Sequence, residues 1–185
     1  SKEGEARMMG RGANYAVEKS MAGILINGFS TAIGDGQYLF DTDHDKNSEE
    51  TTVHYDNLLT GPLTHDNLEL AEKQLAANMI SPDGIPIPMY GKPIIVFGSA
   101  LKGKSARLFS DRADLLPGSP NNDINRFAGT YTPIEWRLLG AAFGGSDTAW
   151  YIIFPWTKML KFIWQVKPHY VSWVDNATES YIFSG

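Results

Sequence analysis

The chain has 185 residues, of which 43% are hydrophobic and 12% aromatic, and its net charge at pH 7 is −5. This composition is sufficient for a buried core in one domain or two small subdomains. The absence of cysteine excludes a disulfide scaffold, a thiol nucleophile and cysteine-ligated metal. Nucleic-acid recognition normally needs a basic stripe, which is absent here. The sequence also has no apolar run as long as a membrane span.

The first predicted element is a long helix over residues 3–27, which ends before Gly28, a residue that favours a helix C-terminus. Small side chains recur along one side of this helix and would let another backbone approach closely. That backbone belongs either to the same chain, which we favour, or to a neighbouring subunit. The stripe consists of Ala6, Met9, Ala13, Ala16, Ser20 and Gly23.

Residues 28–79 are predicted to hold a turn, a short strand and a second helix. The turn falls at Asp35–Gly36 and the strand at Tyr38–Phe40. Thr64 is a favourable N-cap for a helix that extends to about Met79. The buried face of this helix is expected to consist of Leu68, Ala71, Leu75 and Met79.

The acidic sequence LFDTDHDKNSEE, residues 39–50, is the stretch that most resembles a metal site. A helix–loop–helix calcium loop beginning at Asp41 would need glycine at its sixth position and glutamate at its twelfth. The chain has Lys46 and Thr52 there, and His44 and His54 alone do not make a zinc site. We therefore predict a solvated polar loop, with apolar anchors just before it. These anchors are Leu39 and Phe40.

The sequence of the C-terminal half predicts several strands, which are joined by loops and one helix. Residues 93–98 form a continuous apolar run, which is typical of a central buried strand. Ser99 is expected to cap a helix over about 100–110, and residues 110–127 read as a long polar loop. The apolar positions of that helix are Leu101, Ala106, Leu108 and Phe109. Further strands are predicted within residues 130–140, 144–155, 158–168 and 179–185.

One motif points to an enzyme. Gly98, Gly103, Lys104 and Ser105 match the spacing of a phosphate loop and follow an apolar strand. However, the residues between the two glycines favour a helix, and no strand ending in a metal-binding aspartate follows. A capped helix is therefore the favoured interpretation, and a phosphate-loop NTPase is the alternative.

Other catalytic patterns are not found. There is no Gly-x-Ser-x-Gly sequence, and the four histidines form no metal-binding pair at helical spacing. We predict no catalytic, cofactor-binding or metal-ligating residues. The five tryptophans suit core or interface positions, although a sugar-binding platform would use the same side chains. They are Trp136, Trp150, Trp156, Trp164 and Trp173.

Several stretches, in order along almost the whole chain, resemble the major capsid proteins of tailed bacteriophages, especially the Mu-like major head subunits. ILINGFSTAIGDGQYLFDTDH resembles the segment that follows the long helix in that family. YDNLLTGPLTHDNLELAEKQL, KPIIVFGSAL and SPNNDINRFAGTYTPIEWRL resemble the segments that come next. The matching positions are Asn27, Gly28, Phe29, Asp35, Gly36, Leu39, Phe40, His44, Asn125, Ala149, Trp150 and Tyr151.

The resemblance implies an α+β chain with the tailed-phage major capsid shell fold, which encapsulins share. Residues 1–54 would form part of the peripheral domain with its spine helix, and residues 55–150 mainly the axial domain. Residues 151–185 would be strands that return to the peripheral domain, incomplete here. The chain would be a core fragment without the N-terminal arm, the extended loop before the helix and the final strand.

The function implied by the resemblance is structural and not enzymatic. Copies of the chain would form pentamers and hexamers in the icosahedral shell of a tailed phage or prophage. Scaffold and portal proteins would be partners, DNA would be enclosed without specific binding, and no membrane, cofactor or metal would be involved. The protein would be assembled in the host cytoplasm and reside in the virion. The alternatives are an encapsulin-like nanocompartment shell, a phosphate-loop NTPase and a carbohydrate-binding module.

Overall fold

A computed structural model describes residues 2–45, 54–81, 85–88, 90–110, 125–155, 163, 171–175 and 180–184. It contains a mixture of helices and strands, so the chain is of the α+β class. Two compact units are formed, one by Ala22–Met159 and the other by Ser1–Met21 with Leu160–Gly185. The elements are α1 (Lys2–Asn27), β1 (His44–Asp45), β2 (His54–Tyr55), α2 (His65–Asn78), β3 (Ile94–Phe97), η1 (Ser99–Leu101), α3 (Lys102–Leu108), β4 (Thr132–Glu135), η2 (Arg137–Leu139), η3 (Ala141–Phe143), β5 (Trp150–Ile153), β6 (Val171–Asp175) and β7 (Ser180–Ser184).

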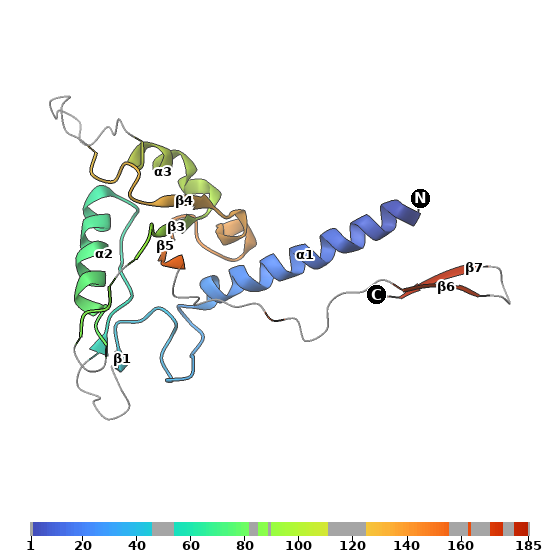
Figure 1. The fold of residues 1–185 in the computed structure, drawn as a ribbon, viewed down its shortest axis with the longest axis horizontal. Coiled ribbons are helices and arrows are strands. Elements are labelled where there is room, and N and C mark those ends of the chain that lie inside the picture. The colour runs from blue at the N-terminus through green and yellow to red at the C-terminus, as the bar shows by residue number, and fades with distance from the viewer. Residues whose placement is uncertain are drawn as a thin grey trace. The chain divides into compact units, whose positions relative to one another are not determined.

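The long helix α1 confirms the predicted helix over residues 3–27 (Figure 1). Among the α1 side chains that the structure describes, the buried ones are Ala22 and Leu25, in the last turns. The predicted packing of the small-residue stripe within the chain is not seen between Met9 and Ser20, because these residues are exposed or half-buried. None of the described helices is both long enough and apolar enough to cross a membrane.

The sheet of the larger unit has the strand order β4-β3-β5, so β3 is central, as its apolar run predicted. Strands β3 and β4 are parallel, and the chain passes from one to the other through η1 and α3. Strand β5 is antiparallel to β3 on the other side. Pro133 lies in β4, which suits an edge strand because proline has no N–H to donate.

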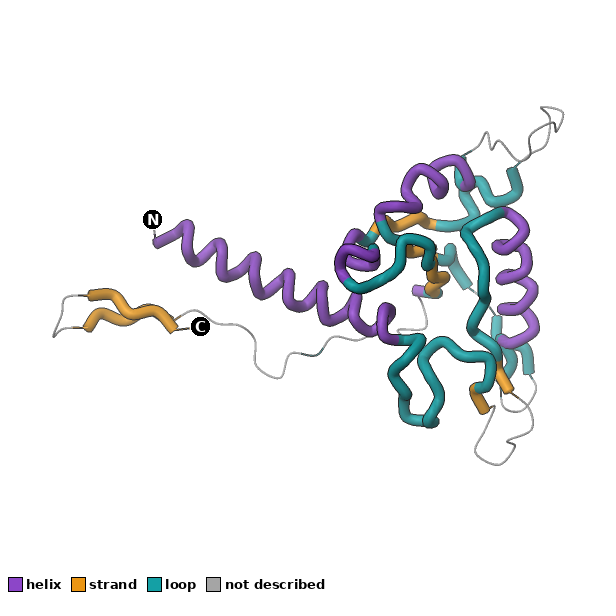
Figure 2. Tube along the Cα trace, turned by 180° about the vertical axis from the view of Figure 1, so that it is seen from behind, coloured by secondary structure: helices purple, strands orange, loops and turns teal. Residues whose placement is uncertain are grey.

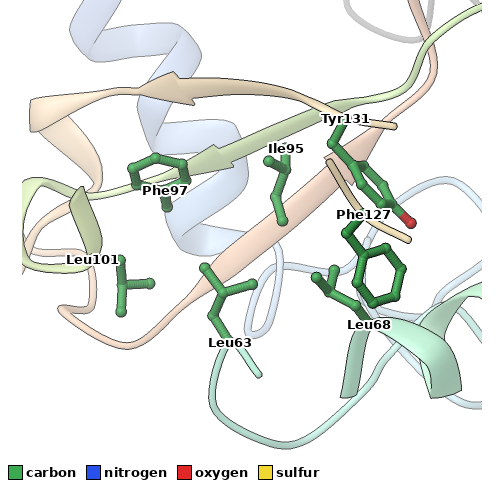
Figure 3. Close-up of a cluster of buried hydrophobic side chains, with 7 residues drawn as sticks. All are labelled: Leu63, Leu68, Ile95, Phe97, Leu101, Phe127 and Tyr131. Carbon is green, nitrogen blue, oxygen red and sulfur yellow. The ribbon is translucent and has the colours of Figure 1, made fainter. Parts of the chain in front are cut away.

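Alternation of side chains gives this sheet two apolar faces. On one face, Ile95 and Phe97 of β3 stand beside Ile152 and Trp150 of β5. This face joins the main core, to which α2 and the segments before the strands contribute (Figure 3). The buried members of the core are Leu63, Leu68, Ile95, Phe97, Leu101, Phe127 and Tyr131.

Helix α2 is capped as predicted, and half of its predicted face is buried, whereas Leu75 and Met79 are only half-buried. The Thr64 hydroxyl accepts a hydrogen bond from the Asn67 amide at 3.3 Å, and Leu68 and Ala71 are buried. At the other end, the side chain of Asn78 donates to the carbonyl of Asp56. Both views place β1 and β2 beside this C-terminal end of α2 (Figure 1, Figure 2).

Two local predictions are wrong. Tyr38–Phe40 is not a strand, since it makes only a single bridge between Tyr38 and Ala32, although the turn at Asp35–Gly36 is present. Ser99 does not cap a helix. It begins the 3₁₀ turn η1, and α3 starts only at Lys102, with no side-chain hydrogen bond capping either element.

Three further differences concern α3 and the C-terminal strands. On α3, Ala106 is exposed and Ser105 is buried, opposite to the expected pattern. The strand expected within 130–140 ends at Glu135 and gives way to η2. The strand predicted within 179–185 is confirmed as β7, which pairs with β6, a strand that had not been predicted. The strand predicted within 158–168 lies outside the described residues.

Candidate functional site

The Gly-Lys-Ser end of the phosphate-loop motif lies within helix α3, and not in a loop. Gly98 precedes η1, and Gly103, Lys104 and Ser105 all lie within α3. A phosphate loop instead wraps its backbone N–H groups around the anion before the helix begins. Ser105 is buried rather than free to reach a metal ion. This geometry does not support nucleotide binding at residues 98–105.

The backbone around Gly98 explains why the sequence has glycine there without invoking a phosphate. A Cβ atom at Gly98 would lie 3.2 Å from the backbone nitrogen of Gly140, so the glycine permits close packing on the turn after η2. The nearby Lys102 ammonium forms an ion pair with Glu135 at 2.8 Å. This contact lowers the pKa of Glu135 and raises the pKa of Lys102.

The described part of the acidic stretch, residues 39–45, forms histidine–carboxylate contacts with residues before and after it. The His44 Nδ1 atom lies 2.8 Å from an Asp35 carboxylate oxygen, and this hydrogen bond lowers the pKa of Asp35. The His54 Nδ1 atom lies 3.2 Å from Asp43 and 3.1 Å from Asp45. Within the described part of the chain, no group of three or more histidine and carboxylate side chains is arranged to hold a metal ion.

The tryptophans that are described lie near the sheet. Trp150 on β5 is half-buried against the core, and its indole N–H donates to the carbonyl of Gly61 at 3.1 Å. Trp136 is half-buried just after β4, where its amide donates to the carbonyl of Phe97. Trp173 lies on β6, whereas Trp156 and Trp164 lie outside the described residues. The Trp150 indole therefore has a structural role, in the core and in the contact with Gly61.

The end of α1 is joined to β5 by aromatic rings, which we call the aromatic joint (Phe29, Phe40 and Tyr151). The ring centroids of Phe29 and Phe40 are 4.9 Å apart, and those of Phe40 and Tyr151 are 5.4 Å apart. The Tyr151 hydroxyl donates to the carbonyl of Leu25 at 3.5 Å, and burial raises the pKa of this tyrosine. The predicted role of Phe40 as an apolar anchor is confirmed.

Gly28 makes the aromatic joint possible. A Cβ atom there would lie 2.8 Å from two carbon atoms of the Phe40 ring, so any larger residue would displace the ring. The Phe40 amide donates to the carbonyl of Gly28 at 2.9 Å, which closes the segment between them. The match of Gly28 and Phe40 to the family pattern therefore has a direct packing reason.

Two polar clusters that the sequence did not reveal support the core. The buried Asn125 side chain donates to the carbonyls of Leu108 and Ser110 at 2.9 and 2.7 Å. Tyr131 donates to the Glu72 carboxylate at 2.9 Å, and burial and this carboxylate raise the pKa of Tyr131. Arg126 then binds the other oxygen of Glu72. Each cluster joins residues more than ten positions apart, so no local pattern predicts it.

The outer part of α1 exposes apolar side chains. Met8 is 72% exposed and Tyr15 is 48% exposed, and seven residues separate them, so they lie on the same side of the helix. Gly12 lies on the same side, four positions after Met8 and three before Tyr15, and no atom is within 4 Å of the position that its Cβ would take. Exposed apolar side chains next to a glycine are suited to contact with another polypeptide.

Comparison with known proteins agrees with a structural function. Residues 4–64 match the sequence of a class of structural proteins, the major head subunits of phages. The family model is that of the Mu-like prophage major head subunit gpT. The match confirms the predicted resemblance over these residues, which include α1, the turn at Gly28, Phe29 and Phe40. No match was found among curated proteins or among solved structures.

Proposed function

We propose that this chain is a structural subunit of the head of a tailed phage or prophage, and that it assembles with copies of itself into an icosahedral shell. The match of residues 4–64 to a major head subunit family is the observation that carries this proposal. It spans the long helix α1, the first residues of the aromatic joint and the start of the core at Leu63.

The fold supports the proposal in two ways. The larger unit has its own buried core, so it can fold before any assembly. The outer part of α1 keeps Met8, Met9 and Tyr15 largely uncovered within the chain. Uncovered apolar side chains on a long helix suit a subunit that completes its packing against neighbours.

The finer features belong to the same proposal. The chain would adopt the tailed-phage shell fold, with residues 1–54 in the peripheral domain, 55–150 mainly in the axial domain and 151–185 returning to the peripheral domain. Pentamers and hexamers would enclose DNA without binding it specifically, with scaffold and portal proteins as partners. Assembly would take place in the host cytoplasm. No catalytic residue, metal or cofactor would be needed.

The test is negative-stain electron microscopy of the protein expressed from its full reading frame, with and without a scaffold protein. We expect rings, sheets or closed shells. Small monodisperse particles under both conditions would contradict the proposal, and a shell that encloses a protein cargo instead of DNA would indicate a nanocompartment.

A matched pair of variants tests whether the exposed side of α1 is needed for assembly. Tyr15→Glu places a charge on the exposed apolar side of the helix, and Asn14→Glu places the same charge on an exposed polar position that lies outside both this side and the small-residue stripe. We expect the first variant to reduce the assembled fraction strongly and the second to leave it nearly unchanged. Equal effects would show that this side of α1 is not a contact between subunits.

A further inference from the structure

The loop between β4 and β5, residues 137–148, ends in an exposed apolar tip. Its beginning is anchored by Leu138 and Leu139 of η2, which are buried. The residues of η3 that follow, Ala141–Phe143, are all exposed, and the side chain of Phe143 is the largest of them. The loop therefore presents apolar atoms on the surface from a base that is fixed in the core.

Backbone hydrogen bonds close this loop. The Gly145 amide donates to the carbonyl of Gly140 at 3.2 Å. The Ser146 amide donates to the carbonyl of Leu139 at 2.9 Å. These bonds tie the end of the loop to its beginning, so little conformational entropy is lost when a partner binds the tip.

Two glycines are required for the conformation of the loop. Gly144 has a φ of +91°, which residues with a side chain rarely adopt. A Cβ atom at Gly145 would lie 2.1 Å from the carbonyl oxygen of Leu139. The sequence AAFGG is therefore specific for a closed loop that holds Phe143 at its tip.

The guanidinium group of Arg137 lies over the ring of Phe143. Its Cζ atom is 5.4 Å from the ring centroid, which is within the range of a cation–π contact. This contact uses the charge of the guanidinium and none of its N–H donors, so these remain available for a planar carboxylate. The acidic residue of the loop, Asp147, instead accepts a hydrogen bond from the Ala141 amide at 3.0 Å.

A second arginine of the chain shows what Arg137 lacks. Arg126 lies 5.0 Å from the centroid of the Phe127 ring, and it also forms ion pairs with Glu69 and Glu72. In the part of the chain that the structure describes, Arg137 is exposed and has its contact with a ring but no carboxylate within ion-pair distance. A carboxylate from another polypeptide would complete the same arrangement at the tip.

A second copy of the chain fits this requirement. The chain has 21 acidic and 16 basic residues, so its net charge is −5. An exposed cation beside an apolar ring is attracted to such an acidic surface and is suited to bind it. Arginine and aromatic side chains also dominate the binding energy of many protein contacts.

We propose that the tip, which consists of Arg137, Ala141, Ala142 and Phe143, docks on a second copy of the chain. Arg137 binds a carboxylate of that copy, and Phe143 contacts apolar side chains beside it. The tip of one copy meets a different surface of the next, and heterologous contacts of this kind form rings when they close. This inference rests on the proposed function and adds to it a contact that does not involve α1.

Sedimentation velocity of the protein expressed from its full reading frame tests the tip. Phe143→Ala and Arg137→Glu should each raise the concentration at which half of the chains are assembled by about tenfold, as for residues that dominate a contact. Leu70→Ala and Lys73→Glu are the matched controls, because both residues are exposed and lie on α2. They should change this concentration by less than about twofold. Equal changes in the two pairs would overturn the inference.

The wild-type protein separates this inference from the proposed function. If the wild type assembles and Phe143→Ala assembles equally well, the tip is not a contact, although the proposed function stands. A wild type that remains monomeric with and without a scaffold protein would overturn both. Thermal unfolding followed by circular dichroism verifies that each variant is folded. Arg137→Lys keeps the charge at an exposed position and should weaken assembly less than Arg137→Glu does.

Arg137→Lys also identifies the carboxylate that the tip binds. A water-soluble carbodiimide joins an amine to a carboxylate in contact with it as an amide, and takes up the oxygen that the carboxylate loses as a urea. In a mixture of isotope-labelled and unlabelled chains, mass spectrometry should find peptides that join position 137 of one copy to an acidic residue of another. Crosslinks between copies that all involve other lysines would contradict the inference.

Discussion

The unit of residues 22–159 and the outer part of α1 differ in how they cover their apolar side chains. In the larger unit, Leu63, Leu68 and Phe127 are fully buried by neighbours from the same chain. On α1, Met8 and Tyr15 remain exposed within the described structure. The larger unit therefore derives its stability from its own core. The outer part of α1 keeps apolar side chains exposed, and the proposed contacts between subunits would cover them.

The core of the larger unit should be the most sensitive place to mutation. Phe127→Ala would remove a ring that is 0% exposed and that contacts His65 and Tyr131. We expect the free energy of unfolding to fall by about 3–5 kcal/mol, the range for such truncations in cores. Urea denaturation followed by tryptophan fluorescence measures this loss.

Met8→Ala is the control for the core variant, because Met8 is 72% exposed. It should change the free energy of unfolding by less than about 0.5 kcal/mol. Similar losses in the two variants would contradict the view that the core stabilises the larger unit and that the exposed side chains of α1 do not.

The aromatic joint should be the next most sensitive place. Gly28→Ala would bring a methyl group to 2.8 Å from the Phe40 ring, so the ring must move. We expect a loss of about 1–3 kcal/mol in the free energy of unfolding, as for overpacking. Gly34→Ala is the control, since its Cβ would have no neighbour within 4 Å. Restoration of stability by adding Phe40→Leu to Gly28→Ala would confirm that the clash is the cause.

The elements predicted correctly are those whose residues carry a local pattern. Helix α2 has a Thr64 cap and apolar residues at helical spacing, and β3 is an apolar run of strand length. Gly28 is likewise a local signal, because glycine favours the C-terminus of a helix, and α1 ends just before it. The resemblance to the family over residues 4–64 also rested on such local residues, among them Phe29 and Phe40.

The features that the sequence did not predict depend on residues that are distant along the chain. Strands β1 and β2 have only two residues each, so no local pattern predicts their pairing. The buried Asn125 side chain is a second example, because the carbonyls of Leu108 and Ser110 to which it donates lie 17 and 15 positions earlier. Spacing along the sequence alone does not reveal tertiary partners of this kind.

A substitution in the polar cluster around Glu72 should lower the free energy of unfolding less than a truncation in the core. Glu72→Gln removes the charge that Arg126 and Tyr131 share, and we expect a loss of about 1 kcal/mol in the free energy of unfolding at neutral pH. Tyr131 should also titrate at lower pH in this variant, because the Glu72 carboxylate contributes to its raised pKa. Absorbance of tyrosinate as a function of pH measures the change.

The pH dependence of stability follows from the same contact. The pKa of Tyr131 is raised in the folded state, so the folded protein keeps a proton that the unfolded chain loses above about pH 10. The contribution of Tyr131 to the free energy of unfolding is therefore fully present below that pH and is lost as the pH rises above it. Tyr131→Phe should abolish this part of the decline, and Glu72→Gln should reduce it. An identical alkaline decline in all three proteins would show that other groups cause it.

The smallest expected effect lies on α1 and has the opposite sign. Glycine inside a helix costs about 1 kcal/mol relative to alanine, and nothing in the described structure lies within 4 Å of a Cβ at Gly10 or Gly12. Gly10→Ala should therefore stabilise α1 by about 0.5–1 kcal/mol, measured as slower hydrogen exchange of its amides. Ala16→Gly, at an exposed position of the same helix, is the matched control and should have the reverse effect.

The two glycines also distinguish the local stability of α1 from its proposed use, because Gly12 lies on the exposed side with Met8 and Tyr15, whereas Gly10 lies on the opposite side. If another subunit packs closely on the exposed apolar side, Gly12→Ala should reduce the assembled fraction in electron microscopy even though it stabilises the helix. Gly10→Ala should stabilise the helix equally and leave assembly nearly unchanged. A variant at Gly12 that is more stable and assembles normally would remove the reason for glycine on this side.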